Sequence, residues 1–123
     1  MNRRVINNGV LEVYDEDGRL LLSVEGKKQD DRINVKLCGT IVTSVAHDFE
    51  DELFAFVTVC KKIDIDFEGV THISSMGLKT LLELQRLLDR TEGGELRFCR
   101  VGSDVCEEFR HVGFDELFLI ETI

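Results

Sequence analysis

Two adjacent serines lie where a strand pattern gives way to a helix pattern. Residues 63–67 alternate between apolar and acidic side chains, and a leucine-rich segment follows Ser74 and Ser75. The N-terminus of a helix carries free backbone N–H groups and a partial positive charge, so a phosphate is tolerated there. Two interpretations remain open: one serine is a modification site, or Ser74 or Ser75 is simply the N-cap of the helix.

Other side chains that could support catalysis or bind a metal are scattered. The sequence has no G-x-G-x-x-G, P-loop or H-E-x-x-H motif, and no pair among His47, His72 and His111 has metal-ligand spacing. Asp64 and Asp66 could act as paired carboxylates, but the more solvated face or end of a strand explains their alternation equally. We therefore expect no catalytic residue, no metal site and no cofactor. A small nucleotide-binding enzyme stays as an alternative that a nucleotide titration would test.

The four cysteines are Cys38, Cys60, Cys99 and Cys106, and no two of them have C-x-x-C spacing. The zinc and thioredoxin signatures are therefore absent. Cys38, Cys60 and Cys99 follow apolar, strand-like residues, so we expect them to be buried free thiols in a reducing cytosol.

Length and charge narrow the class of protein. The chain has 123 residues, which suits one domain, and a net charge of −9. An acidic chain is a poor ligand for nucleic acid and for anionic membranes, so neither is an expected partner. No apolar run approaches the roughly 20 residues of a membrane helix, and the N-terminus lacks the apolar core of a secretory signal. We expect a cytoplasmic location.

The first half of the chain predicts mainly β-structure. Strand patterns at residues 10–14 and 19–24 flank an Asp-Gly turn, which indicates a hairpin. Residues 25–31 suggest a polar connection and residues 32–37 a further strand. Apolar side chains at helical spacing then predict a helix over residues 44–57, with Thr43 or Ser44 as its cap.

The second half alternates strands and helices. A strand at 62–67 precedes a loop of about seven residues and a helix at 75–90, whose apolar face is expected to contain Leu78, Leu81, Leu82, Leu84 and Leu88. A strand at 95–101, a helix at 104–111 capped by Ser103 and a strand at 114–120 complete the pattern. The fold class is therefore α/β, in the order β-α-β-α-β-α-β after an N-terminal β-hairpin. Right-handed crossovers and a mixed sheet are expected.

The order of these motifs resembles STAS domains, in particular anti-sigma factor antagonists. That family has a strand of the form "hDhs-gV" followed by D-S-S-G-L at the start of a helix. The matching stretches here are Ile65-Asp66-Phe67-Glu68-Gly69-Val70 and Ser74-Ser75-Met76-Gly77-Leu78. Three further stretches resemble the family. Residues 33–41 resemble the strand that precedes this motif, and residues 93–96 resemble the start of the strand that follows it. Residues 105–118 resemble the family's third helix and the segment with which the domain ends. The expected organisation is an N-terminal β extension at 1–18 and a STAS-like domain at 19–123.

The resemblance implies a regulatory module that binds proteins and is not an enzyme. An anti-sigma factor antagonist would bind an anti-sigma factor that is also a serine kinase, and a serine phosphatase would be a further partner. Ser75 aligns with the family's phosphoacceptor and Ser74 is the alternative, while Ser74 and Met76 replace the family's aspartate and second serine. The residues expected at the docking surface are Thr40, Ile41, Val42, Thr43, Ser74, Ser75, Met76, Gly77 and Lys79. The two replacements favour the alternative, a STAS scaffold without phosphorylation that binds a partner in another signalling complex.

Overall fold

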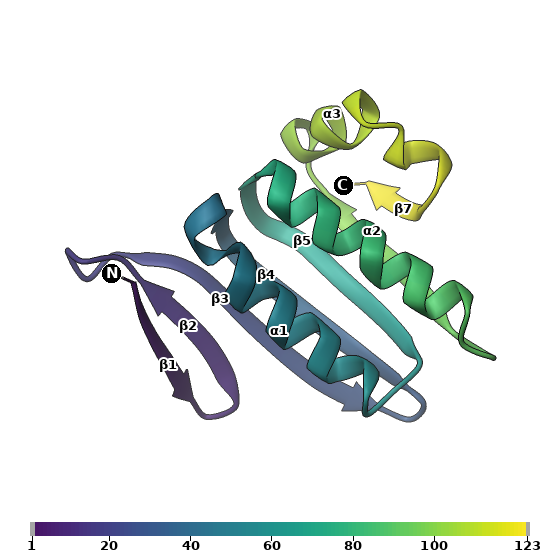
Figure 1. Ribbon diagram of the computed structural model, residues 1–123, viewed down its shortest axis with the longest axis horizontal. Helices are drawn as coiled ribbons and strands as arrows, with labels where there is room; N and C mark the ends of the chain where they lie inside the picture. Colours follow the sequence, from purple (N-terminus) through teal and green to yellow (C-terminus); the bar gives the residue numbers. More distant parts are fainter. Residues whose placement is uncertain (1, 123) are drawn as a thin grey trace.

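The computed structural model describes residues 2–122, which form a sheet of seven strands with helices packed on it (Figure 1). The strands are β1 (Arg3–Asn7), β2 (Val10–Tyr14), β3 (Leu20–Gln29), β4 (Arg32–Ile41), β5 (Lys62–Ile73), β6 (Glu95–Val101) and β7 (Leu119–Thr122). The helices are α1 (Ala46–Val57), α2 (Ser75–Asp89) and α3 (Ser103–His111), with short 3-10 turns η1 (Thr43–Val45) and η2 (Phe114–Glu116). The expected α/β class and the order of elements are confirmed.

The strand order in the sheet follows the order along the chain. β1 to β4 pair antiparallel and β4 to β7 pair parallel, which confirms the expected mixed sheet. Each parallel connection moves one strand further in the same direction. Right-handed crossovers of this kind place α1, α2 and α3 on the same face of the sheet. The opposite face of the central strands is not covered by any helix of residues 2–122.

Buried and exposed side chains alternate along the strands, because successive side chains point to opposite faces and helices cover only one face of the sheet. In β4, Ile33, Val35 and Leu37 are buried beneath the helices, whereas Asn34 and Lys36 are exposed on the uncovered face. The same alternation corrects the expectation for two of the cysteines. Cys38 and Cys99 follow apolar neighbours but point to the uncovered face, so Cys38 is exposed and Cys99 half-buried. Cys60 is buried as expected.

The apolar face of α2 is confirmed with one refinement. Leu78, Leu81, Leu84 and Leu88 are buried, and Lys79 is exposed on the opposite side. Leu82 is only partly buried, because it lies on the flank of the apolar face. The helix is therefore held mainly by four leucines.

Aromatic side chains hold the C-terminal third of the chain to the sheet. The Phe67 and Phe98 rings lie 5.1 Å apart at their centroids, and the Phe98 ring stacks on Phe118 at 4.6 Å. Phe109 of α3 lies 5.7 Å from Phe67 and 5.8 Å from Phe114. Contacts at these separations add to the apolar burial and fix α3 and η2 over β5 and β6.

Two strands are longer than the sequence pattern predicted. β3 runs to Gln29, so most of residues 25–31 is strand and only the turn at Asp30 and Asp31 connects it to β4. Polar residues are tolerated there because they pair across strands on the uncovered face, as Lys27 does with Asn34. β5 continues to Ile73 and replaces the expected seven-residue loop, since residues 69–73 pair with the end of β4.

Helix starts and the last strand also differ from expectation. α1 begins at Ala46 after η1, and neither Thr43 nor Ser44 caps it with a side chain. Ser103 is the first residue of α3 and Gly102 holds the N-cap position. The expectation that Ser103 caps the helix is therefore wrong by one residue. Gly113 adopts a left-handed conformation, with φ of 76°, and turns the chain into η2. The last strand therefore begins at Leu119, not near residue 114.

The N-terminal segment adds two strands to one end of the sheet. β2 was expected and β1 was not, because the short Arg3–Asn7 segment lacks a clear alternation. Leu11 and Val13 of β2 are fully buried, so β2 contributes to the same hydrophobic core as the rest of the sheet. The N-terminal segment also contacts η1 and α1. Asn2 Nδ2 is 3.1 Å from Ser44 Oγ of η1, and Arg4 Nη2 of β1 is 3.6 Å from a Glu52 carboxylate oxygen of α1.

Candidate functional site

The two segments expected at the docking surface lie side by side where β4 and β5 end. Parallel strands end at the same edge of a sheet, and the register places Thr40 opposite His72 and Ile41 opposite Ile73. The backbone N–H of Ser74 then donates a hydrogen bond to the Ile41 carbonyl oxygen at 2.8 Å. We call the nine expected residues, 40–43, 74–77 and 79, together the candidate docking surface.

The two serines of this surface have different environments. Ser74 is the N-cap of α2, with extended backbone angles, and its Oγ accepts a hydrogen bond from the Gly77 N–H at 3.2 Å. Ser74 is half-buried, whereas Ser75, the first residue of the helix, is exposed. The capping interpretation therefore applies to Ser74, and the Ser75 side chain lies in solvent beside the free N–H groups of the first turn.

The remaining residues of the candidate docking surface divide into exposed and buried members. Thr43 and Lys79 are exposed, and Met76 is 47% exposed. Ile41 is fully buried and Gly77 is buried. Thr40, Val42 and Ser74 are half-buried. The structure thus brings all nine residues together, with Ile41 and Gly77 beneath the exposed ones.

Gly77 allows the close approach that forms this surface. A Cβ atom added at Gly77 would lie 2.8 Å from Ile73 Cγ1 and 2.9 Å from Ile41 Cγ2, closer than side-chain atoms pack. The first turn of α2 therefore rests this closely on the ends of β4 and β5 because glycine stands at this position, and a larger residue would force Ile41 or Ile73 to shift.

A contact between a histidine and a carboxylate next to the candidate docking surface was not expected from the sequence. His72 Nδ1 lies 3.2 Å from a Glu108 carboxylate oxygen, which joins the end of β5 to α3. The two residues are 36 positions apart in the sequence and neither stands in a motif, so nothing in the sequence pattern indicated the contact.

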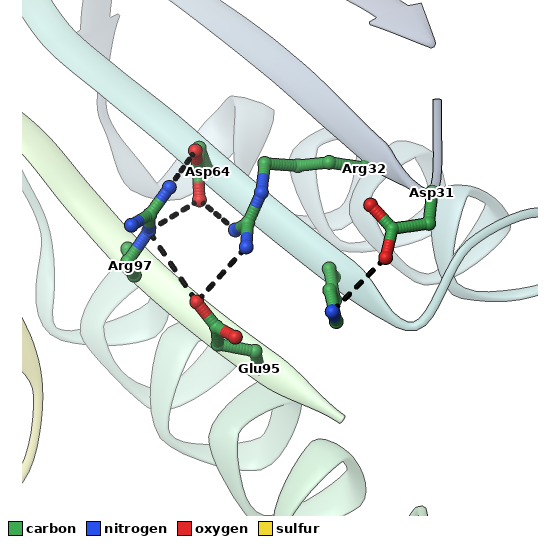
Figure 2. A network of polar contacts seen from close by, with 6 residues as sticks. Asp31, Arg32, Asp64, Glu95 and Arg97 are labelled. Carbon is green, nitrogen blue, oxygen red and sulfur yellow. Dashed lines mark hydrogen bonds and ion pairs between the residues drawn. The ribbon is translucent and has the colours of Figure 1, made fainter. Parts of the chain in front are cut away.

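Asp64 is the centre of a polar network on the uncovered face of the sheet (Figure 2). Arg32 of β4 donates to Asp64 Oδ1 at 2.6 Å, and Arg97 of β6 donates to Asp64 Oδ1 and Oδ2 at 2.9 and 2.7 Å. Arg32 also donates to Glu95 at 3.1 Å. Nearby, Lys62 donates to Asp31 at 3.0 Å. Three neighbouring strands are therefore joined through a single carboxylate.

The electrostatics of this network favour the charged forms. Burial on its own would raise the pKa of Asp64, but the hydrogen bonds from Arg97 and Arg32 outweigh it, so the pKa lies below its ordinary value. The hydrogen bond to Asp64 in turn raises the pKa of Arg97. A general acid or base must exchange a proton near neutral pH, and Asp64 stays ionised there. The arrangement is that of a structural ion-pair network. Asp64 lies on the more solvated face of the sheet, as expected, but its arginine partners cover it, so its side chain is buried.

Asp66, two residues further along β5, pairs with Arg100, which also donates to Glu68 at 3.2 Å. A hollow of about 400 Å³ on the uncovered face lies over these strands and is lined mostly by charged side chains. Within residues 2–122, no group of three or more His, Cys, Asp or Glu side chains is arranged to hold a metal ion. None of the helices in residues 2–122 has both the length and the apolar character that crossing a bilayer requires.

Comparisons with solved structures identify the same fold in anti-sigma factor antagonists. An anti-sigma factor antagonist from Mycobacterium paratuberculosis superposes with a TM-score of 0.76 at 22% identity, over 89% of this chain and 91% of that one. SpoIIAA in its unphosphorylated form gives 0.68 at 15% identity, over 80% and 88%. The phosphorylated form of SpoIIAA from Bacillus gives 0.62 at 15% identity, over 80% and 91%.

The sequence comparisons are consistent with this fold. No curated protein matches the chain in sequence. The family model described as the STAS domain matches residues 23–123, which include every residue of the candidate docking surface. The chain therefore belongs to the STAS domain family.

Proposed function

We propose that this chain is an anti-sigma factor antagonist that binds an anti-sigma factor with serine kinase activity and is switched by phosphorylation of Ser75. The observation that carries the proposal is the contrast between the two serines. The Ser74 hydroxyl is occupied in capping α2, whereas the Ser75 hydroxyl is exposed at the first helical residue. A kinase needs an accessible hydroxyl, so this contrast supports Ser75 over Ser74 as the phosphoacceptor.

The proposed partner would contact the exposed members of the candidate docking surface. Exposed hydroxyl, apolar and cationic groups come from Thr43, Ser75, Met76 and Lys79, on the two segments that adjoin at this edge of the sheet. A partly exposed methionine suits a protein contact because it is flexible and apolar. Ile41 and Gly77 would act from below, by holding the two segments in register.

Phosphate on Ser75 would act on binding and not on the fold. It adds about −1.5 to −2 charges and three acceptor oxygens. The first turn of α2 offers free N–H groups and the positive end of the helix dipole, and Lys79 lies one helical turn further on. These groups favour an anion, so the modified domain should stay folded. The bulk and charge of the phosphate would instead exclude a partner from the surface.

SpoIIAA has been solved in phosphorylated and unphosphorylated forms, which supports a switch of this kind in the chain described here. The proposed protein is a cytoplasmic regulator without catalytic activity. A serine phosphatase would remove the phosphate from Ser75 and so restore the form that binds the partner.

A constitutive STAS scaffold is the second candidate function. The observation that favours it is Met76, exposed at a position where antagonists carry a serine, together with Ser74 in place of their aspartate. A kinase that recognises the usual loop would meet different side chains here. The scaffold would use the same docking surface without a covalent switch.

Calorimetric titration against each anti-sigma factor kinase of the same organism tests the proposal. The unmodified protein and Ser75→Ala should bind one of these kinases, and Ser75→Asp should lose at least about tenfold in affinity. Ser74→Asp serves as a matched control, because the same charge is placed at the N-cap. Equal binding by the unmodified protein and Ser75→Asp would be consistent with the docking surface but would contradict the proposed switch at Ser75. Absence of binding to every kinase would reject the partner.

A further inference from the structure

The two outermost strands of the sheet are chemically complementary to each other. Within residues 2–122, β1 and β7 are the end strands and lie at opposite ends of the molecule (Figure 1). β1 carries the exposed side chains of Arg3 and of Ile6, which is 59% exposed. β7 carries exposed Glu121 and Leu119, which is 62% exposed. An end strand also leaves one row of backbone N–H and C=O groups without a partner strand, so it can accept another strand.

The surroundings of β7 suit an added strand. Three hollows of about 350, 300 and 330 Å³ surround β7, and Leu119 lines all of them. Acidic side chains outnumber basic ones in these hollows. The acidic ones are Asp89, Glu95, Asp115, Glu116 and Glu121, and the basic ones are Arg97 and Arg110. An apolar strip with an acidic rim favours an extended segment that has both basic and apolar side chains. The β1 sequence, Arg-Arg-Val-Ile-Asn, has this composition.

The direction of the strands allows β1 of one copy to continue the sheet of another. β1 runs antiparallel to β2, β2 to β3 and β3 to β4, whereas β4 to β7 are parallel. β1 therefore runs opposite to β7. If two copies join with their helices on the same side, β1 of one pairs antiparallel with β7 of the other, and antiparallel ladders are the more stable kind.

The alternation of side chains selects a register for this pair. Arg3 lies opposite Tyr14 on the uncovered face, where its guanidinium is 5.2 Å from the ring centroid. Leu119 lies opposite Arg97 on that same face, and Glu121 follows two residues later. A register with Arg3 of one copy opposite Glu121 of the next also places Val5 opposite Leu119. One ion pair and one apolar pair then form on the uncovered face.

We propose that this chain self-associates head to tail, with β1 of one copy added to the β7 edge of another. Like edges would not pair as well. Two β1 strands bring two Arg3 side chains within a Debye length of each other, since Arg4 is already paired with acidic side chains of α1, and two β7 strands bring two Glu121 side chains together. A contact between unlike edges is heterologous and leaves one free edge at each end, so it extends into chains and does not stop at a dimer. Because strands of four and five residues bury little surface, the association is weak and depends on concentration. The proposal is independent of the docking function.

Sedimentation velocity of the full chain from about 10 μM to about 1 mM tests the proposal. The average mass should rise with concentration and fall when salt is added, because the ion pair is screened. Arg3→Glu alone and Glu121→Arg alone each place like charges opposite one another and should raise the dissociation constant about 3- to 30-fold. A mixture of the two variants should associate as the unmodified protein does, since each contact then joins opposite charges.

Arg86→Glu and Glu92→Arg are matched controls, because they make the same charge changes at exposed positions away from both edges. They should associate like the unmodified protein, and all variants should unfold at a similar temperature. A protein that stays monomeric up to about 1 mM would overturn the proposal. So would a mixture that associates no better than its separate components, since only pairing between unlike edges predicts the rescue.

Discussion

The backbone N–H of Ser74 donates a hydrogen bond to the carbonyl oxygen of Ile41 at 2.8 Å, and this contact joins the end of β4 to the start of α2. The two segments that form the candidate docking surface are far apart in the sequence but are fixed to each other here. Gly77 lies directly above the same isoleucine and leaves room for no side chain. The surface is therefore held in one geometry by the ends of two parallel strands.

Gly77→Ala should destabilise the protein although alanine is the better helix former. A methyl group would meet Ile73 and Ile41 at under 3 Å, and overpacking of this kind costs about 1–3 kcal/mol. The higher helix propensity of alanine offsets about 1 kcal/mol of this loss of stability. Urea denaturation gives the difference. Gly102→Ala is the control for the added methyl group, because a Cβ at Gly102 meets nothing within 4 Å, and any loss there reflects only the poorer N-cap that alanine makes for α3. A Gly77→Ala protein more stable than the unmodified one would show that the contact is not tight.

Ser74→Ala and Ser75→Ala should have different effects on stability. Removing the Ser74 hydroxyl leaves the Gly77 N–H without its cap, which costs about 0.5–2 kcal/mol. Ser75 is exposed, so its replacement by alanine should change the free energy of unfolding by less than about 0.5 kcal/mol. Thermal unfolding of both variants measures this. Equal losses would contradict the assignment of the cap to Ser74.

Leu81→Ala should lower the free energy of unfolding by about 2–5 kcal/mol, because the Leu81 side chain is fully buried between α2 and the sheet. Leu82→Ala should cost less, since Leu82 is only partly buried. Lys79→Ala tests the polar face and should leave stability nearly unchanged. If Lys79→Ala destabilised the fold as much as Leu81→Ala does, the orientation of α2 on the sheet would be wrong.

The Asp64 network should make stability depend on pH in acid. The pKa of Asp64 is lower in the folded protein than in the unfolded chain, so its contribution is complete above the unfolded pKa of about 3.9. That contribution is lost as pH falls from about 4 through the folded pKa, because the unfolded state binds the proton first. Asp64→Asn removes this dependence and should cost about 1–3 kcal/mol at neutral pH.

Urea denaturation at about pH 7 and about pH 3 measures the effect. The stability difference between the unmodified protein and Asp64→Asn should shrink at the lower pH. Glu83→Gln is a control for general acid effects, since Glu83 lies on α2 away from the network. A difference that stays constant between the two pH values would show that Asp64 is not held ionised by Arg32 and Arg97.

Much of the fold could be predicted from the sequence because periodicity reports burial directly. The leucine spacing of α2 and the alternation in β4 indicated which side chains face the core. Strand ends could not be predicted in the same way. Residues 69–73 extend β5 only because β4 lies beside them, and residues 25–29 extend β3 only because they pair with residues 32–36 of β4. Such pairing depends on tertiary neighbours, which local spacing does not contain.

The candidate docking surface could be predicted in outline, because the Ser74–Leu78 motif resembles that of a known family. The difference between Ser74 and Ser75 could not, since either serine is a good cap by type. The Asp64 network and the His72–Glu108 pair also lay beyond the sequence pattern. Their partners come from separate strands and helices, and only the assembled sheet brings these side chains together.

Phosphorylation-site mapping by mass spectrometry, on the protein isolated from its native cell in several growth conditions, tests the proposed switch. We expect a phosphorylated fraction that carries the phosphate on Ser75 and whose amount changes with conditions. Fragment ions that separate Ser74 from Ser75 decide the position. Phosphate on Ser74 alone would contradict the assigned roles of the two serines, and no phosphate in any condition would contradict the switch and favour the scaffold.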